Sequence, residues 1–325
     1  MSQPSTATFN TREDLSLTIR EFNHEMNERG YVGHRLMPPL ARDEKNGKVP
    51  RIPLEQELQD FDTKRNPDGT FKRSRMEWED DNYDTQSHGL EATLDDEVVA
   101  RYDDLVDCEQ GEGDRIERAL LRSFEREIVG YWTNVANYDV SRRHTVTNAW
   151  GGGSATPYED VDNVREAMFL ELGAEPNAMF LNRADFRLAI NEAQILARIT
   201  GQTFQDARPG VLNRNEQNLA LALDIPEVIV ANALRNVGQS RNLQRIWPSG
   251  VVVIAKVSDS DDIGTEVALG RSMVWSPFGA IEGDRVGLIS ESYDEPQRAG
   301  SVLRKRGNWK QKVWHVEAAR ILDIT

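Results

Sequence analysis

The sequence predicts an α+β protein whose helices and strands occupy separate parts of the chain. Helical periodicity dominates residues 114–136 and 157–173, whereas the chain from residue 250 onward is a succession of strand patterns. There is no β-α-β repetition, which argues against a doubly wound parallel sheet. Charge provides a third observation: residues 77–114 hold fifteen Asp or Glu and one Arg, a net −14 out of the chain's −15. A segment of this kind, here called the acidic belt, has little apolar surface for a core.

The N-terminal region is predicted to consist of extensions. Residues 11–30 carry apolar side chains at helical spacing and end at Gly30, which predicts a short helix. The side chains of this stripe are Leu15, Ile19, Phe22 and Met26. Four prolines between residues 38 and 53 exclude a continuous helix there, and residues 48–54 alternate like an edge strand.

A long two-stranded loop is expected to follow. Asn66-Pro67-Asp68-Gly69 predicts a tight turn, because Pro fixes φ at its second position and Gly accepts a positive φ. Residues 71–79 then run back with few apolar side chains. An isolated hairpin of this kind is marginally stable in water. We therefore expect the loop to pack on something outside itself.

The longest predicted helix covers residues 114–136. Asp114 and Glu117 have the spacing of a capping box, and Gly111 and Gly113 separate this helix from a shorter one around residue 98. One face is an apolar stripe made of Ile116, Leu120, Phe124, Ile128 and Trp132. Arg118, Arg122 and Arg126 form a second stripe beside it. The pattern predicts one buried face and one basic face.

The remaining elements carry clear boundary signals. Thr156, Pro157 and Gly173 mark the start and end of one helix, and Asn182 caps another after the strand 178–181. Further elements are predicted at 215–223 (helix) and 228–230, 250–257, 267–275, 285–290, 301–306 and 312–324 (strands).

Composition restricts the function classes. Seven Trp and ten Phe indicate real cores, although only 38% of the residues are hydrophobic. The single cysteine, Cys108, excludes an intramolecular disulfide and fits a reducing compartment. No apolar run approaches the roughly 20 residues that span a bilayer, so we expect a soluble protein without a membrane partner. The acidity argues against sequence-independent binding of nucleic acid.

Enzyme signatures are absent. Gly151-Gly152-Gly153-Ser154 lacks the lysine of a phosphate-binding loop, and the five histidines do not have metal-ligand spacing. Cys108 lies among acidic residues, which disfavours a nucleophilic role. We therefore expect no catalytic residue, no metal site and no cofactor. One alternative stays open: a metal-dependent soluble enzyme that uses carboxylates of the acidic belt.

The order of segments between residues 145 and 200 resembles the central region of tailed-bacteriophage major capsid proteins. These segments are Thr147-Asn148-Ala149-Trp150, Pro157-Tyr158-Glu159-Asp160-Val161, the stretch Pro176–Leu181 and the helix from Asp185 to Ile199. The resemblance continues in order through Leu219–Leu223, Ile225–Val230, Val251–Ile254, Ser272–Gly279 and the closing strands from Arg285. It therefore covers most of the chain, although no single short motif is diagnostic.

The resemblance implies the Hong-Kong-97-like viral capsid fold. Its parts would be an N-terminal arm (1–45), an extended β-hairpin loop (46–94), a peripheral domain (95–175 plus 270–325) with a spine helix (114–136), and an axial domain (176–269). The implied role is structural and not enzymatic: pentamers and hexamers of an icosahedral head that encloses DNA without sequence-specific binding.

The implied location is the virion, with assembly in the host bacterial cytoplasm. The implied partners are further copies of the chain, a separate scaffolding protein, a portal and decoration proteins. An encapsulin-like bacterial shell protein is the alternative on the same fold.

Subunit contacts are expected where opposite charges of adjacent copies meet, because unlike charges attract and fix register. The expected interface residues come from the loop tip, the acidic belt and the arginine stripe: Lys64, Arg65, Lys72, Arg73, Arg75, Glu77, Glu79, Asp80, Asp81, Arg118, Arg122 and Arg126.

Overall fold

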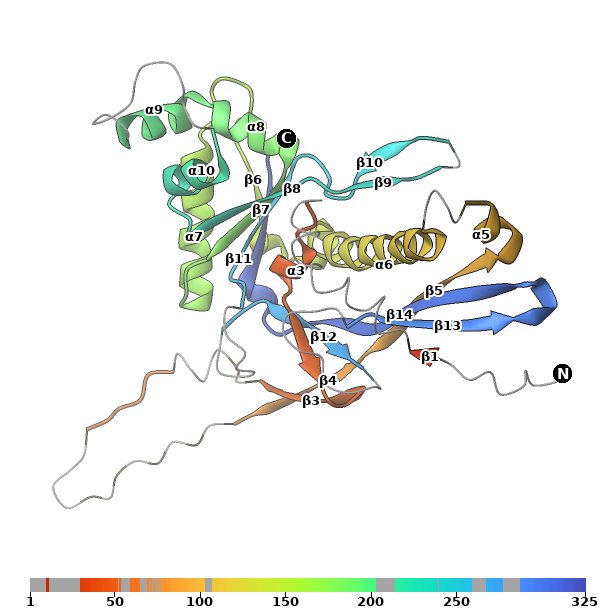
Figure 1. Cartoon of the computed structure of the whole chain (residues 1–325). Coiled ribbons are helices and arrows are strands. Elements are labelled where there is room, and N and C mark those ends of the chain that lie inside the picture. Colours follow the sequence, from red (N-terminus) through yellow and green to blue (C-terminus); the bar gives the residue numbers. More distant parts are fainter. Residues whose placement is uncertain are drawn as a thin grey trace.

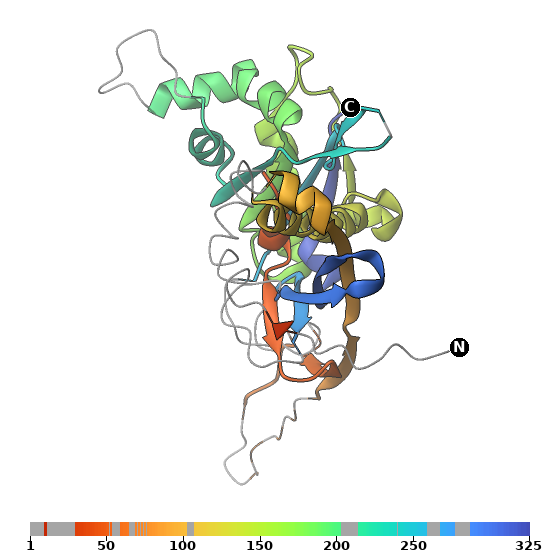
Figure 2. The same ribbon diagram turned by 45° about the vertical axis from the view of Figure 1, so that its right-hand side comes forward.

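Two β-sheets organise the molecule, and one long helix lies against the larger sheet (Figure 1). The computed structural model describes residues 10–11, 30–51, 53, 59–64, 69, 71, 73, 75, 77–102, 107–202, 214–238, 240–258, 267–276 and 287–325. The α+β class expected from the sequence is confirmed. Figure 2 shows the same arrangement from another side, with the green helices beside the smaller sheet above the blue strands of the larger one.

The larger sheet is built around one long strand, β14. Its strands are β1 (Asn10–Thr11), β2 (Pro39–Arg42), β5 (Gln86–Asp95), β12 (Gly270–Trp275), β13 (Ile289–Glu295) and β14 (Gly300–Val313). One edge of β14 pairs antiparallel with β5, and the other edge pairs first with β13 and then with β12. The sequence predicted separate strands at 301–306 and 312–324. The structure instead joins 300–313 into one strand and begins β15 at Ala319.

Helix α6 (Cys108–Trp132) is the predicted long helix, with different ends. Asp107 is its N-cap, since the Asp107 carboxylate accepts a hydrogen bond from the backbone N–H of Gln110 at 2.9 Å. The predicted start at Asp114 is wrong: Asp114 lies inside the helix, and Gly111 and Gly113 do not interrupt it. The apolar stripe from Ile116 to Trp132 is buried, as its spacing predicted.

The smaller sheet has the order β6-β15-β11-β7-β8. Its strands are β6 (Arg143–Thr145), β7 (Ala178–Asn182), β8 (Glu227–Ala231), β11 (Val251–Ala255) and β15 (Ala319–Asp323). The helices of this half are α7 (Pro157–Leu172), α8 (Arg183–Asn191), α9 (Ala193–Gln202) and α10 (Glu216–Leu223). β7 and β8 lie parallel, so the chain between them, which includes α8, α9 and α10, forms a crossover.

Side chains alternate across the smaller sheet between two hydrophobic cores. Phe180, Val253 and Ile321 belong to the core that also contains the apolar stripe of α6. Met179, Ile254 and Leu322 point to the other face, into the core formed with α7 to α10. Both faces of this sheet are therefore covered, which explains why its strands are almost continuously apolar.

Local signals set several of these boundaries. The Asn182 side chain accepts hydrogen bonds from the backbone N–H groups of Ala184 and Asp185, as expected of a cap. Gly173 ends α7 with φ 72°, also as predicted. Thr156 directly precedes α7 as predicted, but its side chain makes no capping hydrogen bond. The single helix expected after Asn182 is divided at Glu192, whose backbone is extended.

The expected extended loop, 46–94, contains two different parts. β3 (Asn46–Arg51) and β4 (Glu79–Asp84) form a separate two-stranded ribbon, whereas β5 belongs to the larger sheet. The smaller sheet likewise takes β6 and β15 from outside the segment 176–269 expected to be axial. Residues 12–29 and 65–68, which hold most of the predicted N-terminal helix and turn, lie outside the described residues.

Candidate subunit interface

The β3–β4 ribbon lies in the lower part of Figure 1, and residues 52–78 connect its two strands. Two ribbon side chains, Val49 and Tyr83, are buried in a small cluster with Met273 and Trp314 of the body. Beyond the ribbon, the large apolar side chains of Phe61, Phe71 and Trp78 are exposed. The described part of the loop therefore exposes apolar surface.

Two of the predicted interface acids have partners within their own chain. The Lys48 ammonium donates to the Asp80 carboxylate at 2.8 Å across the ribbon. The Lys312 ammonium donates to the Asp81 carboxylate at 2.6 Å and so ties the ribbon to β14. Glu77 and Glu79 are exposed on the same stretch. The sequence analysis expected these acids at an interface between copies, which stays a prediction, and it did not predict the intrachain ion pairs of Asp80 and Asp81.

The basic loop residues are only partly described. Lys64, Arg73 and Arg75 are exposed. Arg65 and Lys72 lie outside the described residues, so the cluster expected at the loop tip stays a prediction.

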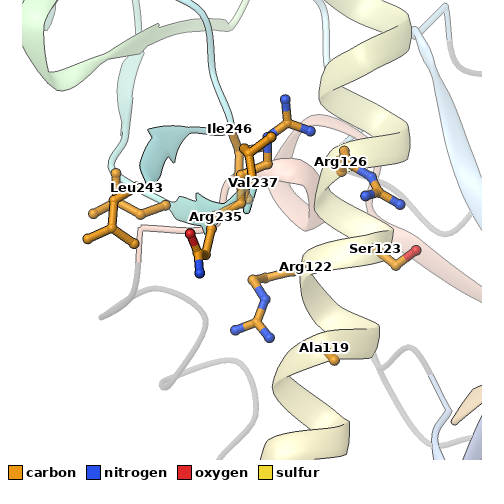
Figure 3. Close-up of a pocket in the computed structure, with 10 residues that line it drawn as sticks. Ala119, Arg122, Ser123, Arg126, Arg235, Val237, Leu243 and Ile246 are labelled. Atoms are coloured by element: carbon orange, nitrogen blue, oxygen red, sulfur yellow. The ribbon is translucent and has the colours of Figure 1, made fainter. Parts of the chain in front are cut away.

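The arginine stripe of α6 faces a groove that the sequence did not predict. The groove lies between α6 and a hairpin made of β9 (Leu234–Asn236) and β10 (Leu243–Arg245), and has a volume of about 580 Å³ (Figure 3). Arg122 and Arg126 line it from the helix, together with Ala119 and Ser123. Arg118 instead pairs with Asp114 one turn earlier, at 3.4 Å. The three predicted arginines therefore divide into one intrahelical pair and two groove residues.

The groove has a basic character. Arg235 of β9 joins Arg122 and Arg126, and no carboxylate is among the lining residues. None of these three arginines makes an ion pair with a residue in the part of the chain that the structure describes. The Arg235 Nε atom is buried and has no acceptor there. Leu234, Val237 and Leu243 give the same groove an exposed apolar wall.

A hairpin signal was present in the sequence. Leu234-Arg235-Asn236 and Leu243-Gln244-Arg245 alternate, and Gly238 lies between them in a polar connection. The two segments are short, and each is largely exposed, so neither has the apolar pattern that made the other strands visible. Arg235 was missed for this reason.

Glu125 fastens the chain at the start of α3 (Gly33–Leu36) to α6. Its carboxylate accepts the backbone N–H groups of Val32 at 2.9 Å and Gly33 at 2.6 Å. The side chain is 1% exposed. Burial raises the pKa of Glu125 to about 7, although the two N–H donors act in the opposite direction.

A buried ion pair fastens the same helix to the larger sheet. The Lys305 ammonium of β14 donates to the Glu117 carboxylate of α6 at 2.5 Å, and both side chains are buried. Helix α6 therefore contacts α3, the larger sheet and the groove. Its position fixes where Arg122 and Arg126 are presented.

Within the described ranges, no three His, Cys, Asp or Glu side chains come together in an arrangement that suits a metal ion. No helix among the described residues has the length and apolar character needed to cross a membrane.

Comparison of the sequence with known proteins finds no matching family model and no matching curated protein. Comparison of the structure finds close similarity. A phage-related protein from Bordetella bronchiseptica RB50 superposes with a TM-score of 0.70 at 18% identity, covering 98% of both chains. The capsid structure of the cyanophage P-SCSP1u gives a TM-score of 0.54 at 10% identity, covering 89% of this chain and 86% of that one.

A bacterial shell protein is also similar. The SrpI encapsulin complex from Synechococcus elongatus PCC 7942 matches with a TM-score of 0.51 at 11% identity, covering 90% of this chain and 86% of that one. The chain therefore has the Hong-Kong-97-like fold of tailed-phage capsid proteins, as its sequence resemblance implied. At these identities, the comparison establishes the fold and leaves the biological role to be argued from the site.

Proposed function

We propose that the chain is the major capsid protein of a tailed double-stranded DNA bacteriophage. The observation that carries this proposal is similarity over nearly the whole length to a phage-related protein, together with similarity to a phage capsid structure. The exposed apolar side chains of Phe61, Phe71 and Trp78 support it, because large exposed apolar side chains mark surfaces that contact another protein. The proposal assigns the chain no enzymatic activity and no cofactor.

In this proposal, self-assembly depends on contacts between the loop of one copy and the acidic residues of the next. The loop of one subunit would lie over a neighbour, with Arg73 and Arg75 near acidic residues such as Glu77 and Glu79 of that copy. Exposed ion pairs contribute only about 0.2–1 kcal/mol each. Many such contacts repeated over pentamers and hexamers hold a shell together through multivalency. In this proposal, 46–94 acts as the extended loop, 95–175 plus 270–325 as the peripheral domain, and 176–269 as the axial domain.

The proposed partners are further copies, a separate scaffolding protein, a portal and decoration proteins. The shell would be assembled in the host bacterial cytoplasm and would form the virion capsid around DNA. The net charge of −15 suits such a container, because an acidic lining does not grip phosphates during packing and release.

Electron microscopy of the purified protein tests the proposal. The full-length chain is concentrated, fractionated by size exclusion and examined in negative stain. Closed shells, tubes or capsomer rings are the expected result. A folded species that stays monomeric at every concentration would contradict unaided self-assembly.

An encapsulin-type shell is the second candidate, because the SrpI encapsulin has the same fold. The contents of particles isolated from the native source separate the two. Nuclease-protected DNA supports the phage capsid, and a packaged protein cargo supports the encapsulin.

A further inference from the structure

Helix α5 (Asp96–Tyr102) is a short helix that buries none of its residues. It follows β5 directly, and two of its apolar side chains are exposed, Val98 by 48% and Tyr102 by 45%, whereas Val99 is half-buried. An isolated helix of seven residues is unstable in water, because nucleation is unfavourable and few hydrogen bonds follow. Among the described residues, α5 therefore leaves Val98 and Tyr102 largely exposed.

The two acidic side chains of α5 form no ion pair within the described part of the chain. Asp96 and Glu97 lie in its first turn, and neither forms an ion pair with any residue that the structure describes. Other acids of the belt are paired within the chain, among them Asp81 with Lys312 and Glu91 with Arg304. Asp96 and Glu97, at the start of α5, are therefore acids of the belt whose charge is not neutralised by a described residue.

The basic groove is the complementary surface. It presents Arg122, Arg126 and Arg235 without an acidic partner, beside the apolar wall of the hairpin. The part of α6 that lines it, from Ala119 to Arg126, is about 10 Å long, and a seven-residue helix has about the same length. Charge, apolar surface and length therefore match between α5 and the groove.

We propose that helix α5 of one copy docks into the basic groove of a second copy. Asp96 and Glu97 face the three arginines there, while Val98 and Tyr102 contact the apolar wall near Leu243. The contact joins two different surfaces, so it is heterologous and repeats from subunit to subunit until a ring closes. This inference rests on the proposed function, because it names the surfaces through which the copies assemble.

A nucleic acid backbone is the competing ligand for a groove lined by three arginines. The apolar wall made by Leu234, Val237 and Leu243 has no complement on a phosphate chain, whereas Val98 and Tyr102 supply one on α5. The chain's net charge of −15 also opposes the approach of a polyanion. We therefore favour the second copy.

Cross-linking between two full-length populations tests the contact without requiring closed shells. Both populations carry Cys108→Ser. One also carries Val98→Cys and the other Leu243→Cys, with different tags. After mixing and mild oxidation with oxidised glutathione, a mixed disulfide dimer is expected on a non-reducing gel, since the two Cβ atoms must approach to about 4 Å. Val98→Cys mixed with Leu170→Cys, an exposed position on α7, is the matched control and should not cross-link.

Charge exchange separates a specific contact from chance collision. Adding Arg122→Glu and Arg126→Glu to the Leu243→Cys population should lower the cross-link yield about tenfold, which corresponds to about 1.4 kcal/mol. Adding Asp96→Lys and Glu97→Lys to the Val98→Cys population should then restore it. Glu166→Lys, on the exposed side of α7, is the control for charge change in the α5 population and should restore nothing. Circular dichroism confirms that each variant is folded.

The outcomes distinguish this inference from the proposed function. Shells without the cross-link overturn the α5–groove contact and leave the capsid proposal standing. The cross-link without shells, tubes or rings supports the contact and contradicts unaided self-assembly into a shell. Nucleic acid that co-purifies with the wild type and is lost in Arg122→Glu/Arg126→Glu, with no cross-link, identifies a phosphate-binding groove and overturns the inference.

Discussion

The smaller β-sheet buries both of its faces, whereas the β3–β4 ribbon buries almost nothing. All five residues of β7 are buried, and four of the five in β11 are. In the ribbon, the buried apolar side chains are Val49 and Tyr83. Both regions are β-structure, but the sheet buries its apolar side chains within the chain, whereas the ribbon leaves most of its side chains exposed.

This difference separates folding of the single chain from assembly of several copies. The sheet gains its stability from cores within the chain, at roughly 25 cal/mol per Å² of apolar surface buried. The ribbon is held by its antiparallel pairing, one small apolar cluster and the intrachain ion pairs of Asp80 and Asp81. Changes in the sheet should therefore appear as loss of folding, and changes in the loop as loss of assembly.

The largest expected effect is in the sheet. Phe180 is 0% exposed and stacks on Trp247, so Phe180→Ala leaves a cavity between β7 and the core. We expect it to lower the free energy of unfolding by about 3–5 kcal/mol in urea denaturation. The matched change in the loop, Phe71→Ala, removes an exposed ring and should lie within about 0.5 kcal/mol of the wild type. Equal effects at the two positions would abolish the distinction.

A second expected effect concerns the junction between α6 and the larger sheet. Lys305→Met leaves the Glu117 carboxylate buried without its partner, and we expect a loss of about 3 kcal/mol or more. The double variant Glu117→Leu/Lys305→Met removes both charges and should recover most of that loss. A double-mutant cycle by urea denaturation measures the coupling. Additive losses would show that the pair does not act as a unit.

The attachment of α3 should make stability depend on pH. Burial raises the pKa of Glu125 to about 7 from its ordinary 4.5, so between these values the folded state holds a proton that the unfolded state has released. Stability is therefore lost as pH rises through this window, on the order of 3 kcal/mol in total. Glu125→Gln should flatten this slope.

The difference between wild type and Glu125→Gln isolates this group. Asp185 also has its pKa raised by burial, to about 6, and its contribution remains in both proteins. Urea unfolding at pH 5 and pH 8 gives the comparison. Parallel pH curves for the two proteins would exclude Glu125 as the source.

The elements that the sequence predicted best have boundary residues with a local physical role. Asn182 caps α8 with its own side chain, and Gly173 ends α7 in a left-handed conformation that suits glycine. The apolar stripe of α6 from Ile116 onward was predictable because its spacing matches the helical repeat. The start of α6 was not, because Asp107 and Asp114 are both good caps and only packing against β14 and β5 decides between them.

The candidate interface was less visible in the sequence. The charge pattern indicated which segments could contact another copy, but it did not predict the groove. The groove forms only where α6 meets the β9–β10 hairpin, and these elements are more than 100 residues apart in the sequence. Lys312 is likewise remote from Asp81 in sequence, so their ion pair has no local signal. Sequence periodicity predicts single helices and strands. Which polar side chains of different elements come together is determined by the tertiary structure.

The smallest effect on folding is expected in the loop, where the effect on assembly should be large. Arg73→Glu combined with Arg75→Glu changes two exposed side chains, so the free energy of unfolding should stay within about 0.5 kcal/mol of the wild type. The same change opposes the acidic belt of a neighbour, so capsomers should fail to form in electron micrographs. Reversal of Arg187 and Arg298, two exposed arginines away from the loop, is the charge-matched control and should leave assembly intact. Normal particles from the Arg73/Arg75 variant would remove the electrostatic role of the loop, and the neighbour would then be held by the exposed aromatic rings of the loop instead.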